Sequence, residues 1–139
     1  MNIFLDSSVL LAACESSTGA SREIFNRSEM NSWDLVAIPY VIEEVERNMP
    51  KLRSLSRVTW SGLRGRLIIR ENVLTMHHPV IFNAGKDRPI LFSGLAYSQV
   101  LLTLDRDDFM DVLGRQFYGL AMMTPGEFLW HQRELGELQ

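Results

Sequence analysis

The chain has 139 residues, enough for one domain with its own hydrophobic core, and we predict a single domain over residues 1–139. Apolar residues make up 46% and charged residues 22%, which is typical of a soluble globular protein, and the formal net charge of -3 gives no overall attraction to nucleic acid. The single cysteine, Cys14, excludes an internal disulfide, and no apolar run approaches the roughly 18 residues that span a bilayer, so we expect a cytoplasmic protein with no membrane partner.

The first half of the chain alternates short apolar runs with helical patterns. Ile3–Leu5 is a continuous apolar run, which is typical of a parallel strand covered on both faces. Pro39 suits the first position of a helix, where its missing N–H costs nothing. The elements predicted here are helices over residues 7–15, 20–30, 39–49 and 55–67, and a strand over residues 35–38.

The second half continues this alternation. We predict strands over residues 72–76, 101–104 and 120–123, a loop over 77–88, and helices over 89–97 and 125–135. Thr124 and Glu127 form a capping-box pattern around Pro125 at the start of the last helix. Alternating strands and helices predict a three-layer α/β/α fold with a mainly parallel central sheet.

Two aspartates follow predicted strands, Asp6 after Leu5 and Asp105 after the run that ends at residue 104. The carboxyl ends of parallel strands form one crevice, where ligands bind, so these acids are candidates for one pocket that Asp87 and Asp108 can join. Several bare carboxylates in one pocket repel one another, and a divalent cation resolves the conflict. Oxygen ligands favour Mg²⁺ or Mn²⁺, which indicates a metal-dependent phosphoryl-transfer enzyme.

Each of these acids also has a structural interpretation. Asp6 is a suitable N-cap for the helix that begins at Ser7, and Asp87 for the helix that begins near residue 89. Asp105 suits a turn, and Asp108 suits a solvated loop. A capping carboxylate can still bind metal, so the two interpretations are compatible and the case rests on joint placement.

Three glutamates, Glu43, Glu44 and Glu46, lie on the helix predicted over residues 39–49. Helical periodicity does not choose which of them faces the acidic pocket. We expect at least two of the three to face solvent and to pair with Arg47 or Lys51.

Positive charge is concentrated in residues 47–70. Half of the chain's 14 Lys and Arg lie there, with no acidic residue among them: Arg47, Lys51, Arg53, Arg57, Arg64, Arg66 and Arg70. The segment is either a solvated helical face or a rim that contacts nucleic-acid phosphates beside the acidic pocket. Trp60 is either a core residue or a stacking surface for a base.

Several short motifs, in order along nearly the whole chain, resemble PIN-domain ribonucleases and most closely the VapC-like toxins of bacterial toxin–antitoxin pairs. The matching segments are Phe4-Leu5-Asp6-Ser7-Ser8-Val9-Leu10, Val41-Ile42-Glu43-Glu44-Val45, Lys86-Asp87-Arg88-Pro89-Ile90-Leu91, Leu102-Thr103-Leu104-Asp105-Arg106-Asp107-Asp108-Phe109 and Thr124-Pro125-Gly126-Glu127-Phe128-Leu129. The chain departs from the pattern between Pro89 and Asp105, which is about one residue shorter than usual. The basic segment falls where such proteins vary most, so the resemblance assigns it no role.

The resemblance implies a PIN-like domain that cleaves RNA with Mg²⁺ or Mn²⁺ and that is inhibited by a cognate antitoxin. It also implies that the enzyme is often a homodimer. It places the acidic quartet on Asp6, Glu44, Asp87 and Asp105, with Asp108 as a further acidic position. Within this set, the implied metal ligands are Asp6, Asp87, Asp105 and Asp108. It also implies that Ser8 and Thr103 donate or accept hydrogen bonds within the site.

A different class of function is also open: a catalytically inactive PIN-like module whose acidic pocket binds an Arg-rich partner segment or a structural metal. A third alternative is a phosphatase-like or receiver-like α/β domain. The receiver interpretation lacks a paired acid after the first strand and a suitably placed lysine.

Overall fold

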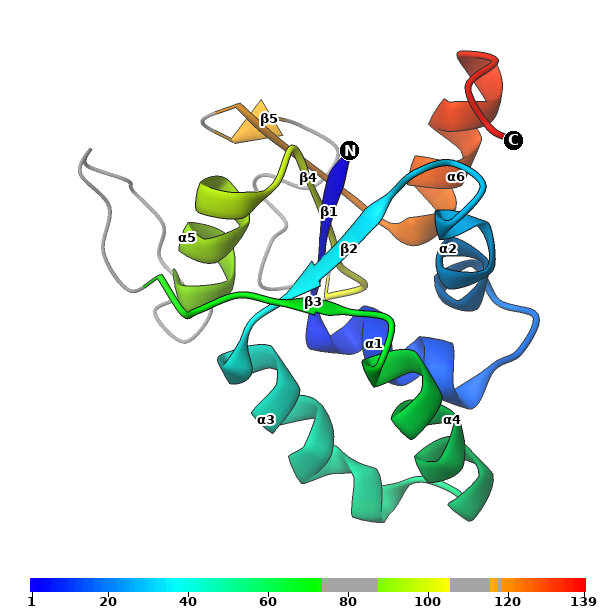
Figure 1. Cartoon of the computed structure of the whole chain (residues 1–139), viewed down its shortest axis with the longest axis vertical. Helices are drawn as coiled ribbons and strands as arrows, with labels where there is room; N and C mark the ends of the chain where they lie inside the picture. The colour runs from blue at the N-terminus through cyan, green and yellow to red at the C-terminus, as the bar shows by residue number, and fades with distance from the viewer. Residues whose placement is uncertain (74–87, 106–115, 118) are drawn as a thin grey trace.

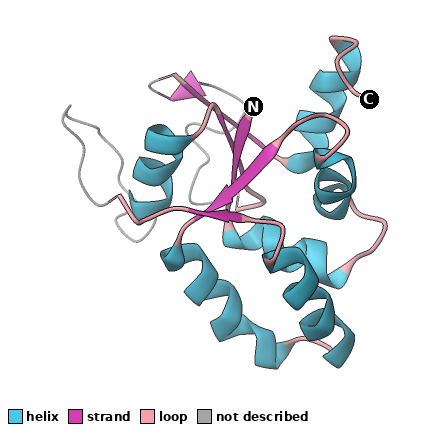
Figure 2. Ribbon diagram, viewed as in Figure 1, coloured by secondary structure: helices cyan, strands magenta, loops and turns pink. Residues whose placement is uncertain are grey.

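The structure is a computed structural model that describes residues 1–73, 88–105, 116–117 and 119–139. Figure 2 shows its helices and strands. The helices are α1 (Ser7–Glu15), α2 (Ala20–Ser28), α3 (Pro39–Asn48), α4 (Ser54–Arg64), α5 (Arg88–Tyr97) and α6 (Pro125–Glu134), with the 3-10 turn η1 (Met49–Lys51) after α3. The strands are β1 (Asn2–Leu5), β2 (Asp34–Ala37), β3 (Ile68–Ile69), β4 (Val100–Leu102), β5 (Gln116–Phe117) and β6 (Leu120–Met123).

The strands form one sheet in the order β3-β2-β1-β4-β6-β5. Each neighbouring pair in this order from β3 to β6 is parallel. Strand β5, at one edge, runs antiparallel to its neighbour β6. The central strand β1 pairs through Ile3 with Leu35 of β2 and Val100 of β4. Ile3, Phe4 and Leu5 are fully buried, as expected for a parallel strand with both faces covered. The predicted α/β fold with a mainly parallel sheet is confirmed.

Helices cover both faces of this sheet. Helix α5 packs against β1 and β4, whereas α2 contacts β2 and packs against α6. In Figure 1, α5 lies on one side of the strands and α2 and α6 lie on the other, which is the three-layer arrangement predicted from the sequence. The rings of Trp33 and Phe128 meet edge to face with 5.0 Å between centroids, which fixes α6 against the end of the turn that precedes β2.

Two strand predictions differ from the structure. The third strand lies at Ile68–Ile69 and pairs with β2, whereas Asn72 and Val73 of the predicted 72–76 strand are outside any strand and residues 74–76 lie outside the described residues. Asn72 instead accepts a hydrogen bond at Oδ1 from the backbone N–H of Tyr40, 3.0 Å away, so it binds the first turn of α3. Strand β5 was not predicted, because its pairing with β6 is set by tertiary structure.

The first helix, α1, and the last helix, α6, begin at the residues predicted from the sequence. Asp6 is the N-cap of α1, and the capping box of α6 is confirmed: Thr124 accepts from the Glu127 N–H at 3.2 Å and contacts the Glu127 carboxylate at 3.0 Å. In the part of the chain that the structure describes, no helix has the length and apolar character needed to cross a membrane.

Candidate active site

Asp6 lies at the carboxyl end of the central strand, and it is only 4% exposed. Its backbone N–H donates to the carbonyl of Leu102 in β4, 3.0 Å away, which continues the ladder between the two strands. Its Oδ1 accepts from the Ser7 N–H at 2.8 Å and has a longer contact of 3.4 Å with the Ser7 hydroxyl. The capping interpretation is therefore correct, and it leaves the other oxygen free to serve a second set of donors.

Two hydroxyls connect Asp6 to the chain that follows β4. Ser8 Oγ donates to Asp6 Oδ2 at 3.1 Å and accepts from the Leu104 N–H at 3.0 Å. Thr103 Oγ1 donates to the same Oδ2 at 2.7 Å and accepts from the Asp105 N–H at 3.0 Å. Each hydroxyl therefore accepts from one backbone N–H and donates its proton to the carboxylate. This arrangement holds the backbone of Asp105 beside Asp6, as expected for acids at adjacent strand ends.

Burial changes the acidity of this carboxyl. The pKa of Asp6 is raised from 3.8 to about 6, chiefly because burial penalises its charged form. Hydrogen bonds from Thr103, Ser7 and Ser8 oppose that rise, and the negative charge of Glu44 adds to it. The charged form of Asp6 is therefore disfavoured by its surroundings, and a cation that binds there would favour it.

Glu44 is the glutamate of α3 whose charge acts on Asp6. It is half-buried and raises the pKa of Asp6, whereas Glu43 and Glu46 are exposed, which confirms that two of the three face solvent. The predicted pairing of these glutamates with Arg47 or Lys51 is wrong for Glu46, which instead lies 3.4 Å from Arg64. Arg64 comes from α4, so the pairing depends on how α4 packs beside α3, which helix spacing alone does not define.

The remaining acids divide into two groups. Asp105 is half-buried, next to Thr103. Asp87 and Asp108, two of the four implied metal ligands, lie outside the described residues. Among the residues that are described, no group of three or more His, Cys, Asp or Glu side chains is arranged to hold a metal ion. The described donors, Asp6, Glu44 and Asp105, are all oxygen ligands, which suit Mg²⁺ or Mn²⁺.

The basic side chains of residues 47–70 are exposed, but several of them make contacts within the protein. Arg66 donates to the backbone carbonyl of Phe25 and to Ser28 Oγ at 3.2 Å, and its guanidinium lies 5.8 Å from the centre of the Phe25 ring. Arg53 donates to the Glu15 carbonyl at 2.8 Å. The last four backbone carbonyls of a helix have no partner within the helix. The two arginines donate to carbonyls of this kind, so they stabilise the C-terminal ends of α2 and α1.

Other members of the segment make weaker contacts. Arg57 donates to the carbonyl of Pro50 at 3.3 Å, and Lys51 Nζ is 3.4 Å from the Asn48 side chain. Trp60 is 6% exposed and belongs to the core, so of its two interpretations the structural one holds. A phosphate-contacting role for the exposed cations stays a prediction.

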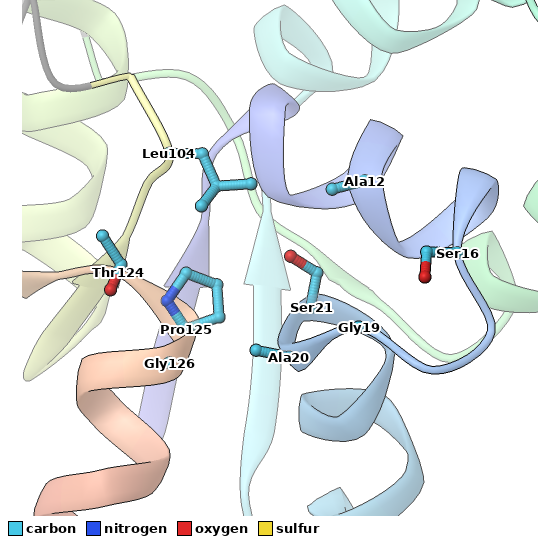
Figure 3. A pocket seen from close by; sticks show the side chains of 9 residues that line it. All are labelled: Ala12, Ser16, Gly19, Ala20, Ser21, Leu104, Thr124, Pro125 and Gly126. Atoms are coloured by element: carbon cyan, nitrogen blue, oxygen red, sulfur yellow. The ribbon is translucent and has the colours of Figure 1, made fainter.

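A pocket that the sequence did not reveal opens beside the strand ends (Figure 3). It has a volume of about 350 Å³. Its lining residues come from α1, α2, the end of β4 and the start of α6: Ala12, Ser16, Gly19, Ala20, Ser21, Leu104, Thr124, Pro125 and Gly126. These residues are small or apolar and carry no charge, so composition and charge patterns gave no signal for them.

Comparisons with known proteins address the fold. No protein-family model and no curated protein sequence matches the chain. The structure is similar to a chain in the crystal structure of VapBC2 from Rickettsia felis bound to a DNA fragment from their promoter, with a TM-score of 0.62 over 88% of this chain and 97% of that chain. This chain has a PIN-like α/β fold. At 14% sequence identity the likeness extends to the fold alone.

Proposed function

We propose that the chain is a metal-dependent endoribonuclease and the toxin of a toxin–antitoxin pair. The observation that carries the proposal is the buried carboxylate of Asp6, which two hydroxyls join to the backbone of Leu104 and Asp105 at the carboxyl ends of β1 and β4. A PIN-like fold and a structural neighbour from a VapBC2 complex support the same assignment.

We assign a separate chemical role to each group of side chains in the site. Asp6 and Asp105 are proposed as metal ligands, together with Asp87 and Asp108. Asp6 Oδ1 accepts from the Ser7 N–H at 2.8 Å and has only a longer, weaker hydroxyl contact of 3.4 Å, whereas Oδ2 accepts two hydroxyl protons. We therefore propose Oδ1 as the oxygen with a lone pair available for a cation. A bound Mg²⁺ or Mn²⁺ would supply an acidic water and offset negative charge on the phosphodiester.

Glu44 is proposed as the group that orients the attacking water and accepts its proton. It is half-buried next to Asp6, and its carboxylate is not used in an ion pair with a described residue, unlike that of Glu46. Exposed cations of the 47–70 segment, with Arg47 and Arg57 among them, would contact the phosphates of the RNA strand.

The experiment compares RNA cleavage by the wild type, Asp6→Asn and the matched control Asp34→Asn. Asp34 is exposed at the start of β2, whereas Asp6 follows the end of the parallel neighbour β1. Its substitution therefore makes the same chemical change at the opposite end of these two strands, away from the site. We expect cleavage of single-stranded RNA by the wild type and Asp34→Asn with Mg²⁺ or Mn²⁺, loss with chelator, and no cleavage by Asp6→Asn. Equal cleavage by Asp6→Asn in a nuclease-free preparation contradicts the proposal.

Toxicity and partners require a second measurement. Induced expression of the wild type is expected to stop growth and to change total RNA, whereas Asp6→Asn is expected to do neither. Co-expression with a small protein encoded next to the chain is expected to restore growth and to yield a stable complex, and size-exclusion chromatography tests the proposed homodimer.

The alternative function is a binding module without catalysis, in which the acidic pocket holds an Arg-rich segment or a structural metal. The raised pKa of Asp6 favours neither alternative, because a guanidinium and a metal ion both supply positive charge. Binding of an Arg-rich peptide with no Mn²⁺ binding at millimolar concentration would support the module and exclude the nuclease.

A further inference from the structure

Two helix N-termini meet at the pocket of Figure 3. Gly19, Ala20 and Ser21 form the start of α2, and Thr124, Pro125 and Gly126 form the start of α6. All six line the pocket. Helices carry partial positive charge at their N-termini, so both helices favour an anion in this space. The lining contains no acidic side chain that would oppose it.

The helix starts also leave unused hydrogen-bond donors. Gly19, the N-cap of α2, provides no side-chain acceptor, and the N–H groups of Ala20, Ser21 and Arg22 have no partner among the described residues. At α6 the Thr124 side chain satisfies only the Glu127 N–H. The Gly126 N–H likewise has no partner in the described part of the chain. An oxyanion would satisfy such groups.

An independent observation comes from the side chain of Ser21. This residue is 6% exposed, and its hydroxyl makes no hydrogen bond with any described residue. Figure 3 shows its oxygen directed into the pocket, toward the space between Leu104, Ala12 and Pro125. A hydroxyl that opens on a pocket and has no protein partner can donate its proton to a ligand oxygen bound there.

The pocket adjoins the candidate active site. Leu104 lines the pocket with its side chain, while its N–H donates to Ser8 Oγ in the Asp6 hydrogen-bond network. Ala12 lines the same pocket one helical turn after Ser8, which corresponds to about 6 Å along α1. A strand whose reacting phosphate lies at Asp6 therefore passes the pocket with a neighbouring nucleotide.

We propose that this pocket binds a phosphate group of the nucleic-acid strand, next to the phosphate that is cleaved, and so sets the register of the substrate. The inference rests on the proposed nuclease function and adds a subsite to it. A phosphate fits better than a base, because the lining provides hydroxyl and peptide N–H donors but no aromatic ring on which a base would stack.

The test measures binding of a short single-stranded oligoribonucleotide with chelator present, so that cleavage does not occur. Ala20→Asp places a carboxylate at the first helical position of α2, an exposed site where an acid stabilises the helix, and it repels a phosphate. Asn26→Asp adds the same charge at an exposed position near the other end of α2 and is the matched control. Ser21→Ala removes the donor without breaking a hydrogen bond to any described residue.

We expect Ser21→Ala to weaken binding by about tenfold, since a hydrogen bond to a charged group contributes that much. Ala20→Asp should weaken binding by about as much because its carboxylate repels the phosphate, and Asn26→Asp should bind like the wild type. Thermal unfolding should show both pocket variants at least as stable as the wild type. An oligonucleotide with a neutral methylphosphonate backbone should bind equally to Ser21→Ala and wild type. Inorganic phosphate should shift the amide resonances of Ser21 and Gly126.

Equal affinity of wild type, Ala20→Asp and Ser21→Ala for the oligoribonucleotide overturns the pocket assignment, as does a Ser21→Ala loss that persists with the neutral backbone. The two proposals fail separately. If metal-dependent cleavage is observed and the pocket variants bind normally, only the subsite is wrong. If the binding differences are found without cleavage under any metal condition, the phosphate site stands and the nuclease assignment is wrong.

Discussion

Replacing Asp6 by asparagine should change how the stability of the protein depends on pH. In the metal-free protein the pKa of Asp6 is raised to about 6 from 3.8, mainly by burial. Between these two pH values the folded chain therefore binds more protons at this position than the unfolded chain. The contribution of the protonated form to stability is fully present below pH 4 and is lost as the pH rises through 6.

The magnitude follows from the shift of about two pH units. Each unit corresponds to 1.36 kcal/mol, and part of the shift is already expressed at pH 4, so ionisation of Asp6 lowers the free energy of unfolding by about 2 kcal/mol between pH 4 and pH 7.5. Asp6→Asn lacks this titration. The difference in unfolding free energy, variant minus wild type, should therefore increase by about 2 kcal/mol over that range, whatever constant offset the lost hydrogen bonds cause.

Urea unfolding with chelator present measures this difference. Trp33 and Trp60 are each 6% exposed, so their fluorescence reports loss of the core. Asp34→Asn leaves the buried Asp6 carboxyl in place, so it should keep the part of the pH profile that Asp6 causes. Adding Mn²⁺ at pH 7.5 should stabilise the wild type and Asp34→Asn but not Asp6→Asn. A difference between Asp6→Asn and wild type that stays constant from pH 4 to pH 7.5 would refute the reasoning.

Four further variants test contacts in the site, the core and the basic segment. Thr103→Val removes the shortest hydrogen bond to the buried carboxylate, at 2.7 Å, and should lower stability at pH 7.5 by about 1–3 kcal/mol in urea unfolding. Arg66→Lys loses the planar guanidinium that makes two contacts, and the free energy of unfolding should fall by about 1 kcal/mol. Arg47→Gln should change the free energy of unfolding by less than about 0.5 kcal/mol and should weaken oligonucleotide binding. A stable Arg66→Lys together with a destabilised Arg47→Gln that binds normally would contradict these roles. Gly94→Ala places a Cβ 2.9 Å from Leu101 Cδ1 and should lower the thermal midpoint, by an amount that corresponds to about 1 kcal/mol; an unchanged midpoint would show that the β4 side chain moves aside freely.

Much of the fold was predictable because local and tertiary signals agree. The run at Ile3–Leu5 is apolar since both faces of β1 are covered, and the capping box at Thr124 marks where α6 begins. The strand at Ile68–Ile69 was not found, because two β-branched residues directly after the helix predicted over residues 55–67 lack a pattern of their own. They form a strand because the edge of β2 offers them hydrogen-bond partners.

The candidate site was predictable where it depends on strand order and not where it depends on helix packing. The backbone of Asp105 lies beside the Asp6 hydrogen-bond network because β1 and β4 are neighbours in a parallel sheet. Periodicity did not choose Glu44 over Glu43, since the choice depends on how α3 rotates against the sheet. The pocket beside the site was missed because its walls are backbone, small side chains and one serine, whose roles appear only when two distant helices begin at the same place.

Strand β3 has a consequence for how this protein meets other chains. It contributes only two residues, Ile68 and Ile69, to the outer side of the sheet, so few backbone N–H and C=O groups are exposed in a row. An extended segment from another molecule finds too short a template there for β-augmentation, and amyloid-like stacking at this edge is disfavoured for the same reason. Recognition along this edge must rely on side chains.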